Sequence, residues 1–150
     1  MNAKLKTFSL GFVFLLILVS GCATPSSQSL GDIVSKPVIV LQPGRPHSGL
    51  WKSFDINIDY EYKFSGDICS ITGFATLSDF YVMKYSRLND LQVYLLFLDG
   101  NSRVLESNLL ARDLSGNINA KLELNKSFKA PAGSVKISFE YNIHPQPTRE

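Results

Sequence analysis

Cysteine and histidine are the side chains of this sequence best suited to nucleophilic or metal chemistry. The chain contains Cys22, Cys69, His47 and His144. Zinc sites combine these residue types, or add carboxylates, at short fixed spacings, and neither histidine has such a neighbour. The sequence also has no GxSxG motif and no glycine-rich phosphate loop. We therefore predict no metal site, no cofactor, no catalytic residue and no enzymatic activity.

A row of carboxylates is a second candidate for chemistry. Asp55, Asp59 and Glu61 share one parity of an alternating segment, which places neighbouring carboxylates about 7 Å apart or closer if the segment is a strand. Such a row could bind calcium or flank a glycosidic bond. The alternative is the solvated face of a strand, and the interleaved Asn57 and Lys63 favour it.

The first residues have the layout of a secretory signal peptide. Lys4 and Lys6 precede an apolar run of twelve residues, 8–19, which the small residues Ser20 and Gly21 follow. A transmembrane helix needs about twenty apolar residues to cross the bilayer. The run is therefore too short to span comfortably, and we expect a signal helix.

The residues at the end of this segment carry a family resemblance. Val19-Ser20-Gly21-Cys22 resembles the lipobox of bacterial lipoproteins. The resemblance implies cleavage between Gly21 and Cys22, a diacylglycerol on the Cys22 thiol, and attachment of the chain to a membrane of the cell envelope. In bacteria with two membranes, Ala23 would favour the outer membrane, facing the periplasm. An ordinary secretory signal or an uncleaved anchor is the alternative.

Lipidation would also change how the rest of the sequence is interpreted. A thioether at Cys22 leaves Cys69 without a disulfide partner, and Cys69 has the parity of Ile71 and Leu77, so we predict a buried thiol. Removal of Lys4 and Lys6 reduces the 15 basic residues to 13, equal to the 13 acidic ones. Without a basic patch, nucleic acid is not an expected partner.

Composition and periodicity predict one β-sandwich domain. We expect residues 1–21 to be the signal peptide, 22–36 the lipidated cysteine with a flexible linker, 37–144 the sandwich and 145–150 a flexible tail. Alternating apolar and polar residues, or a short apolar run, predict strands. Such segments are residues 54–64, 68–77, 91–98, 103–111, 118–125 and 135–143. Six or seven strands of this kind indicate an all-β, antiparallel β-sandwich, Ig-like or jelly-roll-like.

Some segments are ambiguous. Residues 37–41 could form an edge strand, and 42–49 form a loop by their prolines and glycines. Residues 78–90 are irregular and suggest a strand plus a crossover loop. Residues 102–111 are the main alternative to an all-strand fold, because Leu105, Leu109 and Leu110 could share one face of a helix.

Aromatic residues are the best candidates for contact with a ligand or partner. Trp51, Tyr81, Tyr85 and Tyr94 could stack on sugars or anchor a protein if they are exposed, and the alternative is core packing. Residues 128–141 resemble the final strands of jelly-roll carbohydrate-binding modules. We predict a lipid-anchored, non-catalytic interaction or assembly module that engages an envelope protein, with a glycan-binding module using Trp51 and exposed tyrosines as the alternative.

Overall fold

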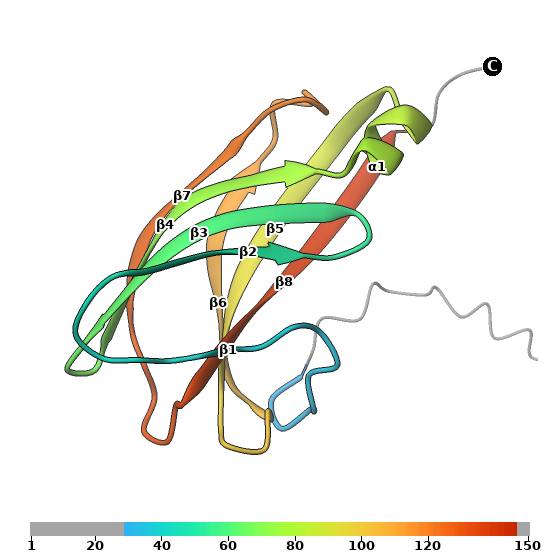
Figure 1. The fold of residues 1–150 in the computed structure, drawn as a ribbon. Helices are drawn as coiled ribbons and strands as arrows, with labels where there is room; N and C mark the ends of the chain where they lie inside the picture. Colours follow the sequence, from blue (N-terminus) through green and yellow to red (C-terminus); the bar gives the residue numbers. More distant parts are fainter. Residues whose placement is uncertain (1–28, 147–150) are drawn as a thin grey trace, which may run out of the picture.

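The computed structural model describes residues 29–146 (Figure 1). The expected signal peptide, the cleavage site at Gly21 and Cys22, and residues 22–28 of the expected linker lie outside the described residues. So do residues 147–150 of the expected tail. No helix within residues 29–146 is long and apolar enough to cross a membrane.

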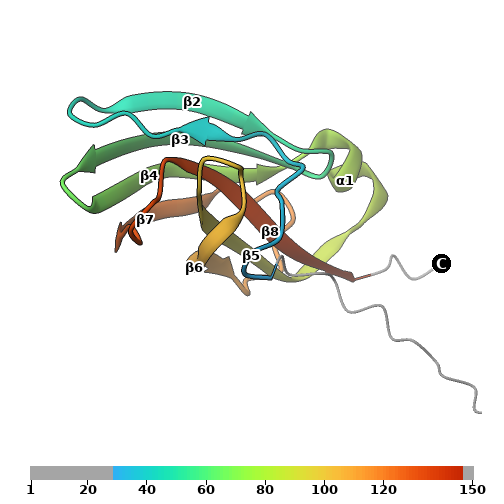
Figure 2. The same cartoon turned by 90° about the horizontal axis from the view of Figure 1, so that it is seen from below.

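Two antiparallel four-stranded sheets form a sandwich, which confirms the predicted fold class. The first sheet has the order β1-β8-β5-β6 and the second the order β2-β3-β4-β7, and their layers can be followed in Figures 1 and 2. The elements are β1 (Ile39–Val40), β2 (His47–Lys52), β3 (Ile56–Ser65), β4 (Ile68–Leu77), α1 (Asp79–Lys84), β5 (Arg87–Leu98), β6 (Val104–Asp113), β7 (Leu122–Lys129) and β8 (Lys136–Gln146).

Most of the alternating segments form strands where the sequence predicted them. β3 buries Ile56, Ile58 and Tyr62 against the core, and the turn at Gly66 pairs it with β4. Gly73 of β4 has φ +141°, and a β-carbon there would overlap the carbonyl oxygen of Asp59, so glycine is required at this close approach. The ambiguous residues 102–111 belong to strand β6, and not to a helix.

Several segments differ from the sequence predictions. The strand expected at 118–125 is β7, which begins and ends four residues later. Residues 79–84 form helix α1, in the segment predicted to be a strand plus a crossover loop. The Ser78 side chain accepts a hydrogen bond from the Tyr81 amide and caps this helix. β2 begins at His47, inside the expected loop, and β8 continues to Gln146, inside the expected tail.

The main core lies between the sheets. Odd-numbered residues of β5, such as Leu95 and Phe97, pack with Phe139 of β8 against Ile58 and Ile71 of the second sheet. The other face of β5 also buries large side chains, because Leu96 and Leu98 form a second cluster with Val34 and Val104. Burial on both faces explains why residues 95–98 are continuously apolar.

A segment before β2, which we call the strap (residues 29–43), covers part of the first sheet. The Gly31 amide donates to the Val104 carbonyl at 2.8 Å, and the Val34 amide donates to the Ser102 carbonyl at 3.0 Å. The Val34 side chain then covers Leu96 and Leu98 of β5. The strap continues to β1, which pairs with the start of β8. Residues 29–36, which the composition assigned to the linker, are therefore hydrogen-bonded to and packed on the sandwich.

One carbonyl of the strap connects it to both sheets. The Trp51 Nε1–H of β2 donates to the Pro37 carbonyl oxygen at 2.8 Å, and the Ser138 hydroxyl of β8 donates to the same oxygen at 2.7 Å. Tyr62 of β3 donates to the Val40 carbonyl at 3.0 Å. These side chains are buried and need acceptors, so their bonds fix the path of the strap.

Removing the two donors at Pro37 should release the strap. We expect Trp51→Phe and Ser138→Ala each to lower the free energy of unfolding by about 1–2 kcal/mol. In the double variant, amide hydrogen exchange at Val34 and Leu41 should become much faster while β5 stays protected. Ser70→Ala removes an exposed hydrogen bond on the second sheet and serves as the control. Unchanged exchange along the strap in the double variant would contradict this role for Pro37.

Candidate functional site

Cys69 lies in the core and is not a reactive group. Its side chain is fully buried in β4, and burial raises the pKa of the thiol to about 11. A thiol with a raised pKa has little thiolate at neutral pH and is a poor nucleophile. The prediction of a buried Cys69 is confirmed.

Trp51 is a core residue, so the alternative interpretation, core packing, is correct for it and contact with a ligand or partner is not. The ring is buried and contacts Phe139 edge-on, with centroids 5.8 Å apart. Its one donor is used by Pro37. The indole face is therefore not available for stacking on a sugar or for contact with a partner.

Tyr81 and Tyr85 pack against each other at helix α1. Tyr81 is buried, its ring centroid lies 4.7 Å from that of Tyr85, and burial raises the pKa of the Tyr81 hydroxyl. Tyr85 is half-buried, and the Lys84 ammonium lies 5.2 Å from the centroid of its ring. Tyr81 and Tyr85 hold the helix on the sandwich. Part of each ring is covered by these contacts, so neither ring can offer a whole face to a ligand.

Tyr94 is half-buried on the outer face of the first sheet, in a connected row of polar side chains. Its hydroxyl donates to Gln92, the Gln92 amide donates to Asp90 at 2.6 Å, and Arg112 of β6 donates two hydrogen bonds to Asp90, both at 2.9 Å. The hydrogen bond from Arg112 is the main reason that the pKa of Asp90 lies below its ordinary value. This row links β5 to β6 and orients Tyr94.

The three carboxylates predicted to share a row do not all do so. Asp59 and Glu61 are exposed on the outer face of β3, whereas Asp55 lies before that strand, in the turn from β2. The Tyr141 hydroxyl donates to Asp55 at 3.3 Å, and the Ser48 hydroxyl donates to Glu61 at 3.3 Å. The solvated-face interpretation therefore describes Asp59 and Glu61.

The two histidines are far from each other in the fold. His47 of β2 stacks on Tyr62 with ring centroids 5.2 Å apart, and His144 of β8 is exposed and pairs in register with Asp90. No group of three or more His, Cys, Asp or Glu side chains in the described part of the chain could hold a metal ion.

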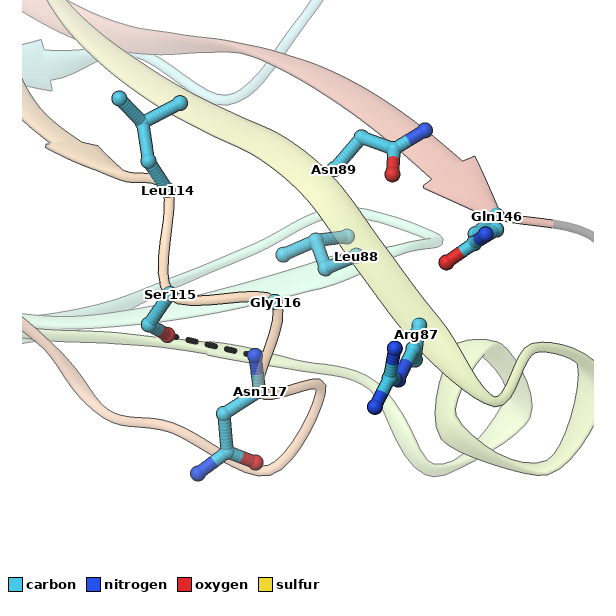
Figure 3. Close-up of a pocket in the computed structure, with 8 residues that line it drawn as sticks. All are labelled: Arg87, Leu88, Asn89, Leu114, Ser115, Gly116, Asn117 and Gln146. Carbon is cyan, nitrogen blue, oxygen red and sulfur yellow. Dashed lines mark hydrogen bonds between the residues drawn. The ribbon is translucent and has the colours of Figure 1, made fainter.

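A polar depression of about 490 Å³ lies where β5 begins and β8 ends. Arg87 and Gln146 stand on one side of it, and the loop residues Ser115 and Asn117 stand on the other (Figure 3). The Ser115 hydroxyl accepts a hydrogen bond from the Asn117 amide at 3.2 Å. The charged and amide groups that line the depression are exposed or half-exposed to water. The depression therefore lacks the enclosed walls that ligand pockets have.

An exposed apolar cluster beside α1 was not found by sequence reasoning. We call it the apolar tip: Phe54 (70% exposed), Phe80 and Met83 (81% exposed). The rings of Phe54 and Phe80 are 4.8 Å apart. The Ser78 amide donates to the Asp55 carbonyl at 2.8 Å, which brings the β2–β3 turn to the helix.

Phe54 is exposed although it lies in the alternating segment 54–64, which was predicted to be a strand. Phe54 has the parity of the buried residues Ile56 and Ile58, but β3 begins at Ile56, two residues later. Phe80 and Met83 are three residues apart on one helix, a spacing that puts them on the same side. That spacing is the sequence signal that could have identified the tip, once a helix was recognised there.

Removing Arg112 should raise the pKa of Asp90. The Asp90 carboxyl has a lowered pKa in the folded state, so its ion pair stabilises the protein above the ordinary carboxyl pKa of about 4 and loses this effect as the pH falls. In Arg112→Gln, NMR titration should show the Asp90 pKa moving up towards that value, and acidification to pH 2.5 should cost less stability than in the wild type. Arg87→Gln is the control and should leave the Asp90 pKa unchanged. An Asp90 pKa unaffected by Arg112→Gln would mean that the ion pair does not form in solution.

No protein family, no curated protein and no solved structure matches this chain.

Proposed function

We propose that this chain is a bacterial lipoprotein whose β-sandwich serves as a non-catalytic interaction or assembly module in the cell envelope. The lipobox-like Val19-Ser20-Gly21-Cys22 behind a signal-peptide pattern supports the anchor. Each buried methylene contributes about 0.8 kcal/mol, so two or more acyl chains hold a protein at a membrane permanently. Where the organism has two membranes, Ala23 favours attachment to the outer membrane, facing the periplasm.

The apolar tip is the observation that carries the interaction role. Phe54 and Phe80 expose adjoining aromatic rings, and Met83 extends the surface with a flexible apolar side chain. Exposed aromatic groups that adjoin one another are typical anchors of protein interfaces. We propose an envelope protein with a complementary apolar pocket as the partner.

The positions of the tip and the strap suit this arrangement. The strap meets the sandwich beside the β5–β6 turn, whereas α1 and the β2–β3 turn lie at the other end of the strands (Figure 1). Twelve residues of β5 join these ends, a length of roughly 35–40 Å. A partner can therefore reach the tip without competing with the attachment of the chain.

A non-catalytic role is supported by the structural roles of three groups with reactive potential. The Cys69 thiol is buried, Asp90 is paired with Arg112, and His47 is stacked on Tyr62. The glycan-binding alternative requires exposed rings, and the burial of Trp51 and Tyr81 removes two of the four on which it depended.

The anchor can be tested at Cys22. We expect Cys22→Ser to abolish incorporation of labelled fatty acid and to shift the protein from the membrane to the soluble fraction, because the thioether can no longer form. Cys69→Ala should incorporate fatty acid like the wild type. If Cys22→Ser is still processed after Gly21 and partitions into detergent like the wild type, the chain is not a lipoprotein.

The tip can be tested by photo-crosslinking in cells. A photoreactive amino acid at Met83 should give one recurrent crosslinked protein, which Phe80→Ser should abolish. Phe80 is 48% exposed and its ring contacts that of Phe54, so we expect this substitution to lower the free energy of unfolding by about 1–2 kcal/mol through lost apolar burial. The same amino acid at Asn125, an exposed polar position of β7, is the control. Equal crosslinking from Asn125 would show that the tip is not the docking surface.

A further inference from the structure

A second group of exposed apolar side chains lies at the end of the sandwich where the strap enters. We call it the apolar rim. Its most exposed members are Leu30 (73%), Ile33 (65%) and Val40 (58%). The complete rim consists of Leu30, Ile33, Val38, Val40 and Val135, all on the strap or beside the start of β8.

Backbone pairing brings the rim residues to one end of the fold. Ile33 forms a bridge with Arg103, just after the β5–β6 turn. Val40 pairs with Lys136 at the start of β8, and the Val135 amide donates to the carbonyl of Leu98, the last residue of β5. The strap, the β5–β6 turn and the β7–β8 turn all lie at the lower end of the molecule in Figure 1.

Carboxylates at this end are used to hold the backbone. Asp99 accepts hydrogen bonds from the amides of Asn101 and Arg103 at 2.8 and 2.9 Å, and Asp32 accepts one from the Ser29 amide at 2.8 Å. The Lys136 ammonium donates to the Gly100 carbonyl at 2.8 Å. These three charged side chains already form hydrogen bonds within the protein. This lowers the free-energy cost of desolvation when this end of the sandwich comes close to an apolar phase.

The length of chain between the rim and Cys22 identifies the occupant. Seven residues, 22–28, precede the first described residue, and seven peptide units span at most about 25 Å. If Cys22 carries the lipid, as in the proposed function on which this step rests, the strap end of the sandwich always stays within that distance of the bilayer. A bilayer is thus present at high local concentration, whereas another protein would have to be recruited.

We propose that the apolar rim rests in the interface of the bilayer to which Cys22 is attached. Leu30 and Ile33 from the strap and Val40 from β1 enter the region between headgroups and acyl chains, where exposed apolar side chains are stabilised. This contact orients the sandwich with its strands rising from the membrane. The apolar tip then points into the aqueous space, at the far end of β5.

The test uses the full lipid-bearing protein in phosphatidylcholine vesicles that contain nitroxide-labelled lipid. Ile33→Cys and Val40→Cys variants are labelled with a polarity-sensitive fluorophore, and Met83→Cys is the matched control because it is also exposed and apolar. Cys69 is buried with a raised thiol pKa and stays unlabelled in the folded protein. We expect a blue-shifted emission and strong quenching by the lipid at positions 33 and 40, and neither at position 83.

The outcomes separate this inference from the proposed function. Vesicle-bound protein with no lipid quenching at 33 and 40, or with equal quenching at 83, would overturn the rim contact and leave the lipoprotein assignment intact. A blue shift without lipid quenching, together with crosslinks between copies at position 33, would assign the rim to a second copy of this chain. Protein that does not bind vesicles, and whose Cys22 takes up the fluorophore in the otherwise wild-type chain, would overturn both.

Discussion

The Pro37 carbonyl oxygen is the point on which the arrangement of this protein depends. A buried indole N–H and a buried hydroxyl each need an acceptor, and leaving either unpaired costs about 1–3 kcal/mol. Trp51 and Ser138 belong to different sheets and donate to this one oxygen. The strap is therefore held in place by both layers of the sandwich, and it closes part of the open side between β2 and β8.

The course of the strap gives the molecule two unlike ends. Val34 completes a cluster on the outer face of β5, so the chain has to enter beside the β5–β6 turn. The β2–β3 turn and α1 are left at the opposite end, with Phe54 and Phe80 in contact and exposed. In the proposed arrangement, attachment and recognition use opposite ends, so the length of the strands separates the partner from the membrane.

The sequence predicted those features whose signal is local. Alternation in residues 54–64 identified β3 because the side chains of a strand point to its two faces in turn. The parity that Cys69 shares with Ile71 and Leu77 placed its side chain in the core. Asp99-Gly100, a dipeptide typical of hairpin turns, lies between β5 and β6. The helix at residues 79–84 was missed because a helix of under two turns shows no clear periodicity. The shifted bounds of β7 were missed because the polar run Asn125 to Ser127 interrupts the alternation within that strand.

Sequence alone therefore determined the fold class, the strands β3 and β4, the burial of Cys69, and the resemblance of the first 22 residues to a lipoprotein signal. Only the tertiary structure decided that residues 29–36 are not a free linker and that Trp51 is internal. Those outcomes depend on contacts between distant residues, such as Ile33 with Arg103 and Pro37 with Ser138. Composition cannot reveal such contacts, because a segment rich in serine and glycine looks the same whether or not a matching surface exists elsewhere in the chain.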